Sequence, residues 1–323
     1  MAFERLAAVT TPAAHIGFGL AAVGRPAYLT TGRARDLPEG RGVEDMRART
    51  HELLDAAYAQ GVRYFDAARS YGRAEEFLAD WLRQRPDARD AVVGSKWGYA
   101  YVGDWRADAE VHEVKDHGPD AFDRQREESA QLLGDRLDLY QIHSVTPDSP
   151  ALTDTGLHAR LAALAADGVT VGFSTSGPEQ AAAVRAAMEI AVDGERLFHT
   201  VQSTYNVLEP AVGEALAEAH DAGLTVIVKE GLANGRLAGA DAPAELLAVA
   251  AETGAEPDAV ALAAVLRQPW AGVVLSGAAT TAQLHSNLAA AAVDLDPAQC
   301  DRLAALAEPA ADYWQRRAAT PWS

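Results

Sequence analysis

Four side chains that could together transfer a proton lie on three separate segments of the sequence. Asp66 and Tyr71 share one segment, Lys96 follows an apolar run, and His143 ends another. An ammonium group beside a phenol favours the phenolate and lowers the phenol pKa from about 10, while a carboxylate keeps that ammonium charged. Asp66, Lys96 and Tyr71 therefore predict a proton-donating chain, and His143 could hydrogen-bond the oxygen that receives the proton.

This combination suits protonation of a carbonyl oxygen while hydride reaches the carbonyl carbon. No side chain donates hydride, so the reaction would need a redox cofactor. An ordinary surface loop would explain Asp66 and Tyr71 alone. The two later segments favour a shared site instead, because Lys96 and His143 each need a partner when they are desolvated at the end of a strand.

The segments that carry these residues are typical of short buried strands, and strand-like and helix-like segments alternate along the whole chain. Eight such units without a composition break predict an α/β fold, a single (β/α)8 TIM barrel domain over residues 1–323. In that fold the carboxyl ends of the strands meet at one rim, where active sites form. The strands are expected at His15–Val23, Arg63–Ala67, Ala91–Trp97, Leu137–His143, Thr170–Ser174, Thr200–Tyr205, Leu224–Lys229 and Gly272–Ser276. The helices are expected at Val43–Gln60, Gly72–Gln84, Ala121–Leu133, Ala151–Ala166, Pro178–Val192, Glu209–Ala222, Ala244–Glu252, Pro257–Arg267, Thr281–Ala291 and Pro297–Ala307.

Two connections are longer than a barrel needs, Gly24–Gly42 and Trp97–Pro119. Loops of this length are more often functional lids than simple connectors. The second connection carries several aromatic residues that could line a substrate pocket, and Trp97, next to Lys96, is the expected wall residue.

The amino-acid composition excludes several classes of function for this protein. The 323 residues are 49% hydrophobic and 23% charged, as in a globular protein with a large core. A net charge of −18 argues against nucleic acid or an anionic membrane as the main partner. Cys300 is the only cysteine, and His112 and His117 match no ligand spacing, so no disulfide and no metal site are predicted. No segment has the ~18 apolar residues of a membrane span, and a cytoplasmic location is expected.

The motifs around the four residues resemble those of the aldo-keto reductase family, and the resemblance covers the whole chain. It rests on Asp66-x4-Tyr71-Gly72, Ser95-Lys96 and Asp138-Leu-Tyr-x-Ile-His143, in that order. The resemblance implies a (β/α)8 barrel that reduces aldehydes or ketones with NADPH or, less often, NADH. It assigns Tyr71 as general acid/base, Lys96 and Asp66 as groups that tune it, and His143 as the group that orients the carbonyl. Gly17-Phe-Gly19 lacks the remainder of a Gly-x-Gly-x-x-Gly fingerprint, so a classical dinucleotide fold is disfavoured.

The same resemblance implies a set of cofactor contacts. Ser174, Thr175 and Gln202 would hold the nicotinamide carboxamide, although asparagine is usual where Thr175 stands. Lys229 replaces the aromatic residue that usually stacks on the nicotinamide, and it could instead pair with Glu230, Asp66 or a pyrophosphate oxygen. The remaining expected cofactor contacts are Gly19, Asp66, Gly231, Leu232, Gly235, Arg236, Gly277, Gln283 and Asn287.

Cofactor choice is expected to depend on the last of these segments. Many NADPH users carry Lys and Arg where this chain has Gly277 and Gln283, while some NADPH users also have Gln. NADP(H) is therefore slightly favoured, and NAD(H) stays possible.

Three function classes follow. The first is a carbonyl reductase, or an alcohol or sugar dehydrogenase in the opposite direction, acting on a small molecule. The second is a nucleotide-binding regulatory or accessory protein on the same fold, with little turnover. The third is a non-redox lyase or isomerase that uses Lys96 as a Schiff base. The sequence does not define the substrate or the oligomeric state.

Overall fold

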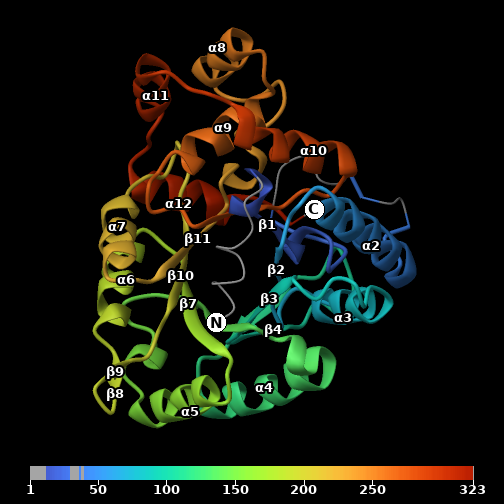
Figure 1. The fold of residues 1–323 in the computed structure, drawn as a ribbon, viewed down its shortest axis with the longest axis vertical. Helices are drawn as coiled ribbons and strands as arrows, with labels where there is room; N and C mark the ends of the chain where they lie inside the picture. Colours follow the sequence, from blue (N-terminus) through green and yellow to red (C-terminus); the bar gives the residue numbers. More distant parts are fainter. Residues whose placement is uncertain (1–11, 30–35, 38–39, 323) are drawn as a thin grey trace.

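Eight parallel strands close into a barrel (Figure 1), in the order β1, β12, β11, β10, β7, β6, β3 and β2 around the wall. The computed structural model describes residues 12–29, 36–37 and 40–322. The strands span β1 Ile16–Gly19, β2 Tyr64–Asp66, β3 Val92–Trp97, β6 Leu139–Val145, β7 Thr170–Thr175, β10 Thr200–Thr204, β11 Thr225–Lys229 and β12 Val273–Ser276. This arrangement confirms the expected (β/α)8 TIM barrel.

Helices surround the barrel and connect its strands. They span α2 Val43–Ala59, α3 Ala74–Gln84, α4 Pro119–Leu133, α5 Thr155–Ala166, α6 Gln180–Met188, α7 Gly213–Asp221, α8 Ala244–Thr253, α9 Pro257–Leu266, α10 Thr281–Ala289, α11 Pro297–Ala304 and α12 Ala310–Ala319. The helix predicted over Pro178–Val192 ends early, because β8 Ala191–Val192 pairs with β9 Glu195–Arg196 in a hairpin. Helix α12 was not predicted.

The alternation of side chains along each strand explains how polar groups reach the rim. Apolar residues fill the barrel interior at the amino ends of the strands, where Tyr64, Val92 and Leu139 belong to one buried cluster. Asp66 lies two residues beyond Tyr64, on the same face of β2. The same period carries β3 from Val92 to Lys96 and β6 from Leu139 to His143. The interior face of each of these three strands therefore starts apolar and ends in a polar group.

Gly94 provides the space that Tyr64 needs inside the barrel. A Cβ atom at Gly94 would lie 3.0 Å from Cζ of Tyr64 and would press on its hydroxyl. We expect Gly94→Ala to lower the free energy of unfolding by about 1–3 kcal/mol through overpacking. Chemical denaturation would measure this. The control is Gly277→Ala, where an added Cβ meets no atom within 4 Å and unfolding should not change. Equal stability of the two variants would contradict the packing argument.

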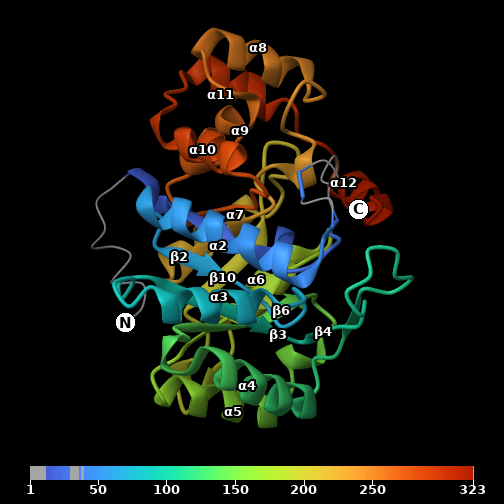
Figure 2. The ribbon, with the colours of Figure 1, turned by 90° about the vertical axis from the view of Figure 1, so that its right-hand side faces the viewer.

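The connection after β3 forms an antiparallel hairpin, with β4 Tyr99–Tyr101 paired to β5 Glu113–Lys115. Figure 2 shows this hairpin projecting from the barrel on the same side as α12. The C-terminal segment also reaches the first long connection, since Trp322 and Leu29 form an antiparallel bridge. Part of the lid expected over Gly24–Gly42, residues 30–35 and 38–39, lies outside the described residues.

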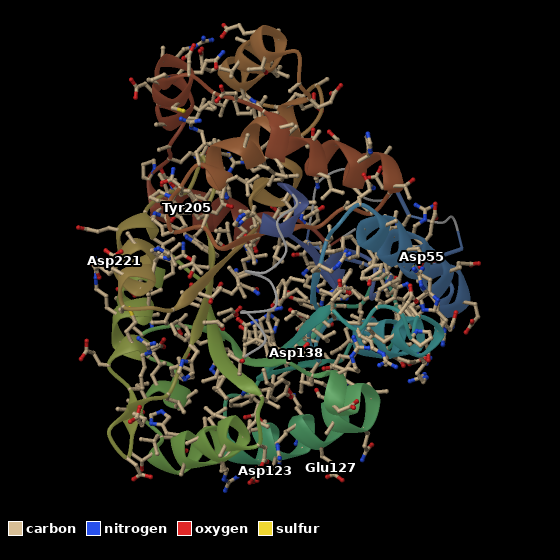
Figure 3. The ribbon with its side chains drawn as sticks, in the orientation of Figure 1. Asp55, Asp123, Glu127, Asp138, Tyr205 and Asp221 are labelled. Atoms are coloured by element: carbon tan, nitrogen blue, oxygen red, sulfur yellow. The ribbon has the colours of Figure 1, made fainter. Side chains whose placement is uncertain are left out.

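Acidic side chains extend from the outer helices, as Asp55, Asp123 and Asp221 illustrate in Figure 3. All three are exposed. The negative charge is thus spread over the outside of the barrel. Among the described residues, no helix has the length and apolar character needed to cross a membrane.

Candidate active site

A cavity of about 1220 Å³ opens at the carboxyl ends of the strands and extends from Tyr71 and His143 to the start of α10. Eleven of the expected cofactor contacts line it, namely Gly19, Asp66, Gln202, Lys229, Gly231, Leu232, Gly235, Arg236, Gly277, Gln283 and Asn287. Ligand sites in parallel α/β barrels form at this rim, because the loops that follow the strands can vary without disturbing the core.

The four residues predicted to share a site do so. Lys96 Nζ lies 3.5 Å from the Tyr71 hydroxyl, which lies 3.5 Å from Nε2 of His143. Lys96 also forms an ion pair with Asp66 and donates to the carbonyl oxygen of Ala67 at 3.0 Å. Tyr71 faces the cavity and is 8% exposed, so its hydroxyl is desolvated but accessible to a ligand. The geometry required for the proton-donating chain is therefore present.

Two further side chains hold the Asp66 carboxylate in place. Tyr64 donates its hydroxyl hydrogen to Oδ1 at 2.9 Å, and Gln202 donates from Nε2 to the same oxygen at 2.9 Å. Both residues are buried. Because Oδ2 faces Lys96, each carboxylate oxygen has a donor, and the orientation of Asp66 is determined by β2, β3 and β10 together.

The electrostatic balance at Tyr71 differs from the sequence expectation. Burial and the Asp66 carboxylate raise the pKa of Tyr71 well above its ordinary value, and the Arg25 guanidinium opposes them. The net lowering of the Tyr71 pKa expected from Lys96 is therefore wrong for this structure, because burial disfavours the charged phenolate. Burial and the cations Lys96 and Lys229 hold the pKa of His143 well below its usual range. At neutral pH both Tyr71 and His143 are uncharged.

A bulge in β6 directs His143 toward the cavity. The pairing of β6 with β7 shifts register between Ile142 and Val145, and Ser144 has a φ of 58°. The hydroxyl of Ser174 accepts a hydrogen bond from the Ser144 amide at 2.8 Å and so satisfies the bulged backbone. Bulges commonly re-aim side chains next to active sites. Ser174 thus supports His143 from within the wall.

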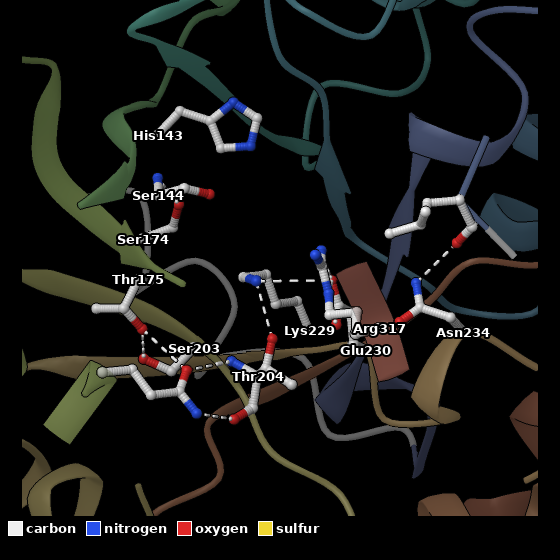
Figure 4. Close-up of polar contacts among 12 residues, drawn as sticks. His143, Ser144, Ser174, Thr175, Ser203, Thr204, Lys229, Glu230, Asn234 and Arg317 are labelled. Carbon is white, nitrogen blue, oxygen red and sulfur yellow. Dashed lines mark hydrogen bonds and ion pairs between the residues drawn. The ribbon is translucent and has the colours of Figure 1, made fainter. Parts of the chain in front are cut away.

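Ser174 and Thr175 do not line the cavity, unlike the other expected cofactor contacts. Both are fully buried. The Thr175 hydroxyl lies 2.7 Å from that of Ser203 and 3.2 Å from Oε1 of Gln180 (Figure 4). Their hydroxyl groups are used inside the wall, whereas Ser144 and Ser176 line the cavity, so the structure does not place Ser174 and Thr175 at the cavity surface.

Trp97 also differs from its expected place. Its side chain is 0% exposed and packs edge-on against Phe122, with ring centroids 5.0 Å apart, and against His117. It therefore supports the wall from behind and does not line this cavity. Since Lys96 points inward, its neighbour in the strand must point outward toward α4. Tyr99, two residues further along, lines the cavity.

Arg25 and Glu113 complete the surroundings of Tyr71 and were not found from the sequence. Arg25 lies with its guanidinium 5.1 Å from the Tyr71 ring centroid and donates to the carbonyl oxygen of Ser70 at 2.9 Å. It also pairs with Glu113 of the hairpin at 2.6 Å. Both line the cavity. The Gly-Arg-Pro sequence at Arg25 was visible, but no local pattern indicates that it meets Glu113.

Lys229 stands at the end of β11 and lines the cavity. Its Nζ donates to Oγ1 of Thr204 at 2.9 Å and lies 3.8 Å from Glu230, as the dashed lines in Figure 4 mark. Burial lowers the pKa of Lys229 to about 8, although Glu230 opposes this. Of the two protein partners considered from the sequence, Glu230 and Asp66, Glu230 is the one within ion-pair distance of Lys229.

Arg317 of α12 binds Glu230 through two nitrogens, with Nη2 at 2.5 Å and Nε at 2.9 Å. Although burial raises it, Arg317 and Lys229 lower the pKa of Glu230 to about 2. The C-terminal helix is thereby attached to the mouth of the barrel. Helix α12 therefore contributes a wall of the site through an ion pair that joins residues far apart in sequence.

Replacing Arg317 should leave the buried carboxylate of Glu230 without its guanidinium partner. We expect Arg317→Met to lower the free energy of unfolding at pH 7 by about 3 kcal/mol. The pKa of Glu230 is depressed from 4.5 to about 2, so this contribution is complete above pH 4.5 and is lost as the pH falls toward 2. Denaturant unfolding of both proteins between pH 3 and pH 7 would measure the difference.

The control for this prediction is Arg316→Met on the same helix. Arg316 is more exposed and pairs with Glu308 at 3.4 Å, so its loss should change stability by less than about 0.5 kcal/mol. A difference between Arg317→Met and the wild type that stays constant below pH 4.5 would show that Glu230 is not the group responsible.

At the end of the cavity far from Tyr71, three of the expected cofactor contacts already bind other groups of the protein. Arg236 pairs with Glu308 through Nη2 at 2.5 Å. Gln283 donates to Asp36 at 2.9 Å and accepts from the Ala279 amide at 2.9 Å. We orient the Asn287 amide so that its nitrogen donates to Asp258 at 2.8 Å and its oxygen accepts from Ser276, because the opposite orientation faces acceptor against acceptor. In the described part of the chain, no group of three potential metal ligands gathers.

Fold and site together define a class of protein: a TIM barrel with a buried Asp, Lys, Tyr and His group beside a cavity lined by glycine-rich loops. The aldo/keto reductase family model matches residues 39–308. The chain belongs to the aldo/keto reductase family, whose members are oxidoreductases that act on carbonyl groups and alcohols.

Individual relatives are distant. The aldo-keto reductase str7 of Strobilurus tenacellus is 25% identical over 320 residues, which cover 90% of this chain and 90% of the relative. A pyridoxal 4-dehydrogenase of Microbacterium luteolum is 28% identical over 243 residues, covering 62% of this chain and 69% of the relative. The holo form of an aldo-keto reductase from Bacillus halodurans has the same fold, with a TM-score of 0.67 at 20% identity over 92% of this chain and 93% of that one.

Proposed function

We propose that this protein is a nicotinamide-dependent oxidoreductase that reduces aldehydes or ketones to alcohols, or oxidises the corresponding alcohol or sugar. One observation carries the proposal. The Tyr71 hydroxyl lies 3.5 Å from both Lys96 Nζ and His143 Nε2, and Tyr71 and His143 line a cavity large enough for a cofactor and a small substrate. A proton donor in this setting matches the chemistry of the family.

The residues would act in the following way during reduction. A reduced nicotinamide, when bound, would supply the hydride that adds to the carbonyl carbon. Uncharged His143 can hydrogen-bond the carbonyl oxygen and orient it. Tyr71, protonated because burial and Asp66 raise its pKa, gives its proton to that oxygen as the C=O π pair moves onto it. Lys96 then faces the tyrosinate, and its ion pair with Asp66 holds Lys96 in place. Oxidation reverses each step.

The cavity suits an extended dinucleotide. Glycines along its wall leave room, since an added Cβ would meet no atom within 4 Å at Gly277 and only one, at 3.6 Å, at Gly19. The start of α10 borders the same space, and helix amino ends favour phosphate groups. Gln202 and Lys229 would contact the nicotinamide end, and Gly231, Leu232, Gly235, Arg236, Gly277, Gln283 and Asn287 the remainder. Ser174 and Thr175 are left out of this set.

Steady-state assays test the proposal against its alternatives. A panel of aldehydes, ketones and aldoses with NADH and NADPH should reveal turnover with at least one pair. Cofactor binding without turnover would favour an accessory nucleotide-binding protein. A Schiff base at Lys96 is disfavoured, because Lys96 Nζ already contacts Asp66, Ala67 and Tyr71. A borohydride-trapped adduct at Lys96 would favour the lyase or isomerase instead.

A further inference from the structure

We propose that Asp36 makes the site selective for NAD(H) over NADP(H), because its carboxylate occupies the place where a phosphate on the adenosine ribose would bind. This inference rests on the proposed function and reverses the slight preference for NADP(H) expected from the sequence. It adds Asp36, in the connection between β1 and α2, to the residues that determine cofactor choice.

The position of Tyr71 and His143 defines which end of the cavity holds which half of the cofactor. Hydride must be delivered beside Tyr71 and His143, so the nicotinamide half belongs at the end that they line. The adenosine half then extends to the other end, which is lined by the segment Ser276–Ala279, by Gln283 of α10 and by Asp36. An adenosine ribose in NADP(H) would bring a 2′-phosphate with about two negative charges into this end.

Asp36 is fixed in that end by two contacts from different elements. Gln283 donates from Nε2 to its carboxylate at 2.9 Å, and Arg49 donates to its backbone oxygen at 3.2 Å. Arg49 also donates to the carbonyl oxygen of Ala279 at 3.0 Å. Asp36 is thereby held against the segment before α10. A carboxylate in this position accepts hydrogen bonds from ribose hydroxyls and repels a phosphate.

Among the described residues that line this end, the remaining charges are mostly negative. Arg49, which donates to the backbone oxygens of Asp36 and Ala279, does not line it. Asp241, Glu256 and Asp258 also line it, and all carry the same sign. Arg236 is the one cation among the described lining residues of this end, and Glu308 already pairs with it at 2.5 Å. A diphosphate can still use the amino end of α10, but an additional phosphate would meet carboxylates. The difference should amount to at least about tenfold in affinity.

Direct binding experiments measure this difference in cofactor affinity and need no catalytic turnover. Titration calorimetry should give a Kd for NADH at least about tenfold below that for NADPH, and a similar ratio for ADP over adenosine 2′,5′-bisphosphate. Asp36→Asn should tighten NADPH about tenfold and change NADH less than about threefold, since the amide can still pair with Gln283. The wild-type ratio should narrow at high salt, because the repulsion acts near solvent.

The matched control is Asp45→Asn, which removes the same charge from the neighbouring helix α2. Asp45 is exposed and does not line the cavity, so both affinities should stay within about twofold. Equal or tighter binding of NADPH by the wild type, or an unchanged ratio in Asp36→Asn, would overturn the inference while leaving the proposed reaction intact. A preference for NADH without carbonyl turnover would support the role of Asp36 and contradict the proposed reaction. Binding of neither cofactor would overturn both.

Discussion

Tyr71→Phe should lower kcat by about a thousandfold or more while cofactor affinity changes less than about threefold. The substitution removes the one hydroxyl that lies between Lys96 and His143, at 3.5 Å from each. General acid catalysis by a positioned group contributes about 10²–10⁴-fold, and no other phenol is within reach of both partners among the described residues. The remaining ring keeps the packing on Arg25, so the site should not collapse.

Single-turnover kinetics together with cofactor titration would measure this expectation. Tyr205→Phe is the matched control, because Tyr205 packs on Trp270 and does not line the cavity. It loses the same atom and should retain activity within about twofold. A Tyr71→Phe variant with more than a tenth of the wild-type kcat would remove Tyr71 from the role of proton donor, whatever the protein's substrate.

Lys96→Met should impair both activity and stability. Lys96 is 0% exposed and Asp66 2%, so the variant leaves a buried carboxylate with Tyr64 and Gln202 as its donors. Breaking a buried pair by removing one partner costs about 3–5 kcal/mol. Activity should fall by about a hundredfold or more, since the tyrosinate formed during reduction would lose its neighbouring cation.

A double variant separates these two effects. Asp66→Asn together with Lys96→Met removes the unpaired carboxylate. The free energy of unfolding should therefore be at least about 1 kcal/mol higher than in Lys96→Met alone. Activity should not recover, because the cation beside Tyr71 is still missing. Lys115→Met on the exposed part of the hairpin is the control and should match the wild type in both measurements. Recovery of activity in the double variant would show that Lys96 acts on stability alone.

The strands and the candidate catalytic residues followed from local patterns. Each predicted barrel strand overlaps the observed one, because a short apolar run between glycine- or proline-containing turns constrains the backbone locally. The meeting of Asp66, Lys96 and His143 also followed from the order of the strands, since a parallel barrel brings their carboxyl ends to one rim.

The resemblance to a family supplied the expected cofactor contacts but not the protein groups that these side chains bind in the structure. Eleven of them line the cavity, whereas Ser174 and Thr175 face the interior of the wall. Hydrogen bonds to Ser144 and Ser203 use their hydroxyls, and these partners come from other strands. The outward direction of Trp97 follows from the alternation of side chains next to Lys96, whereas its packing partner Phe122 comes from the separate helix α4.

The amino-acid sequence by itself determined the barrel, the order of its strands and the convergence of Asp66, Tyr71, Lys96 and His143, because these depend on short-range periodicity and on parallel topology. Tertiary structure alone decided that Arg25 meets Glu113, that Arg317 meets Glu230 and that Asp36 meets Gln283. Each of these pairs joins a loop or terminal segment to a distant element. Their partners are selected by where the closed barrel places the loop ends. Burial and Asp66 have the largest effects on the pKa of Tyr71, and Arg25, Glu113 and Glu230 add smaller ones.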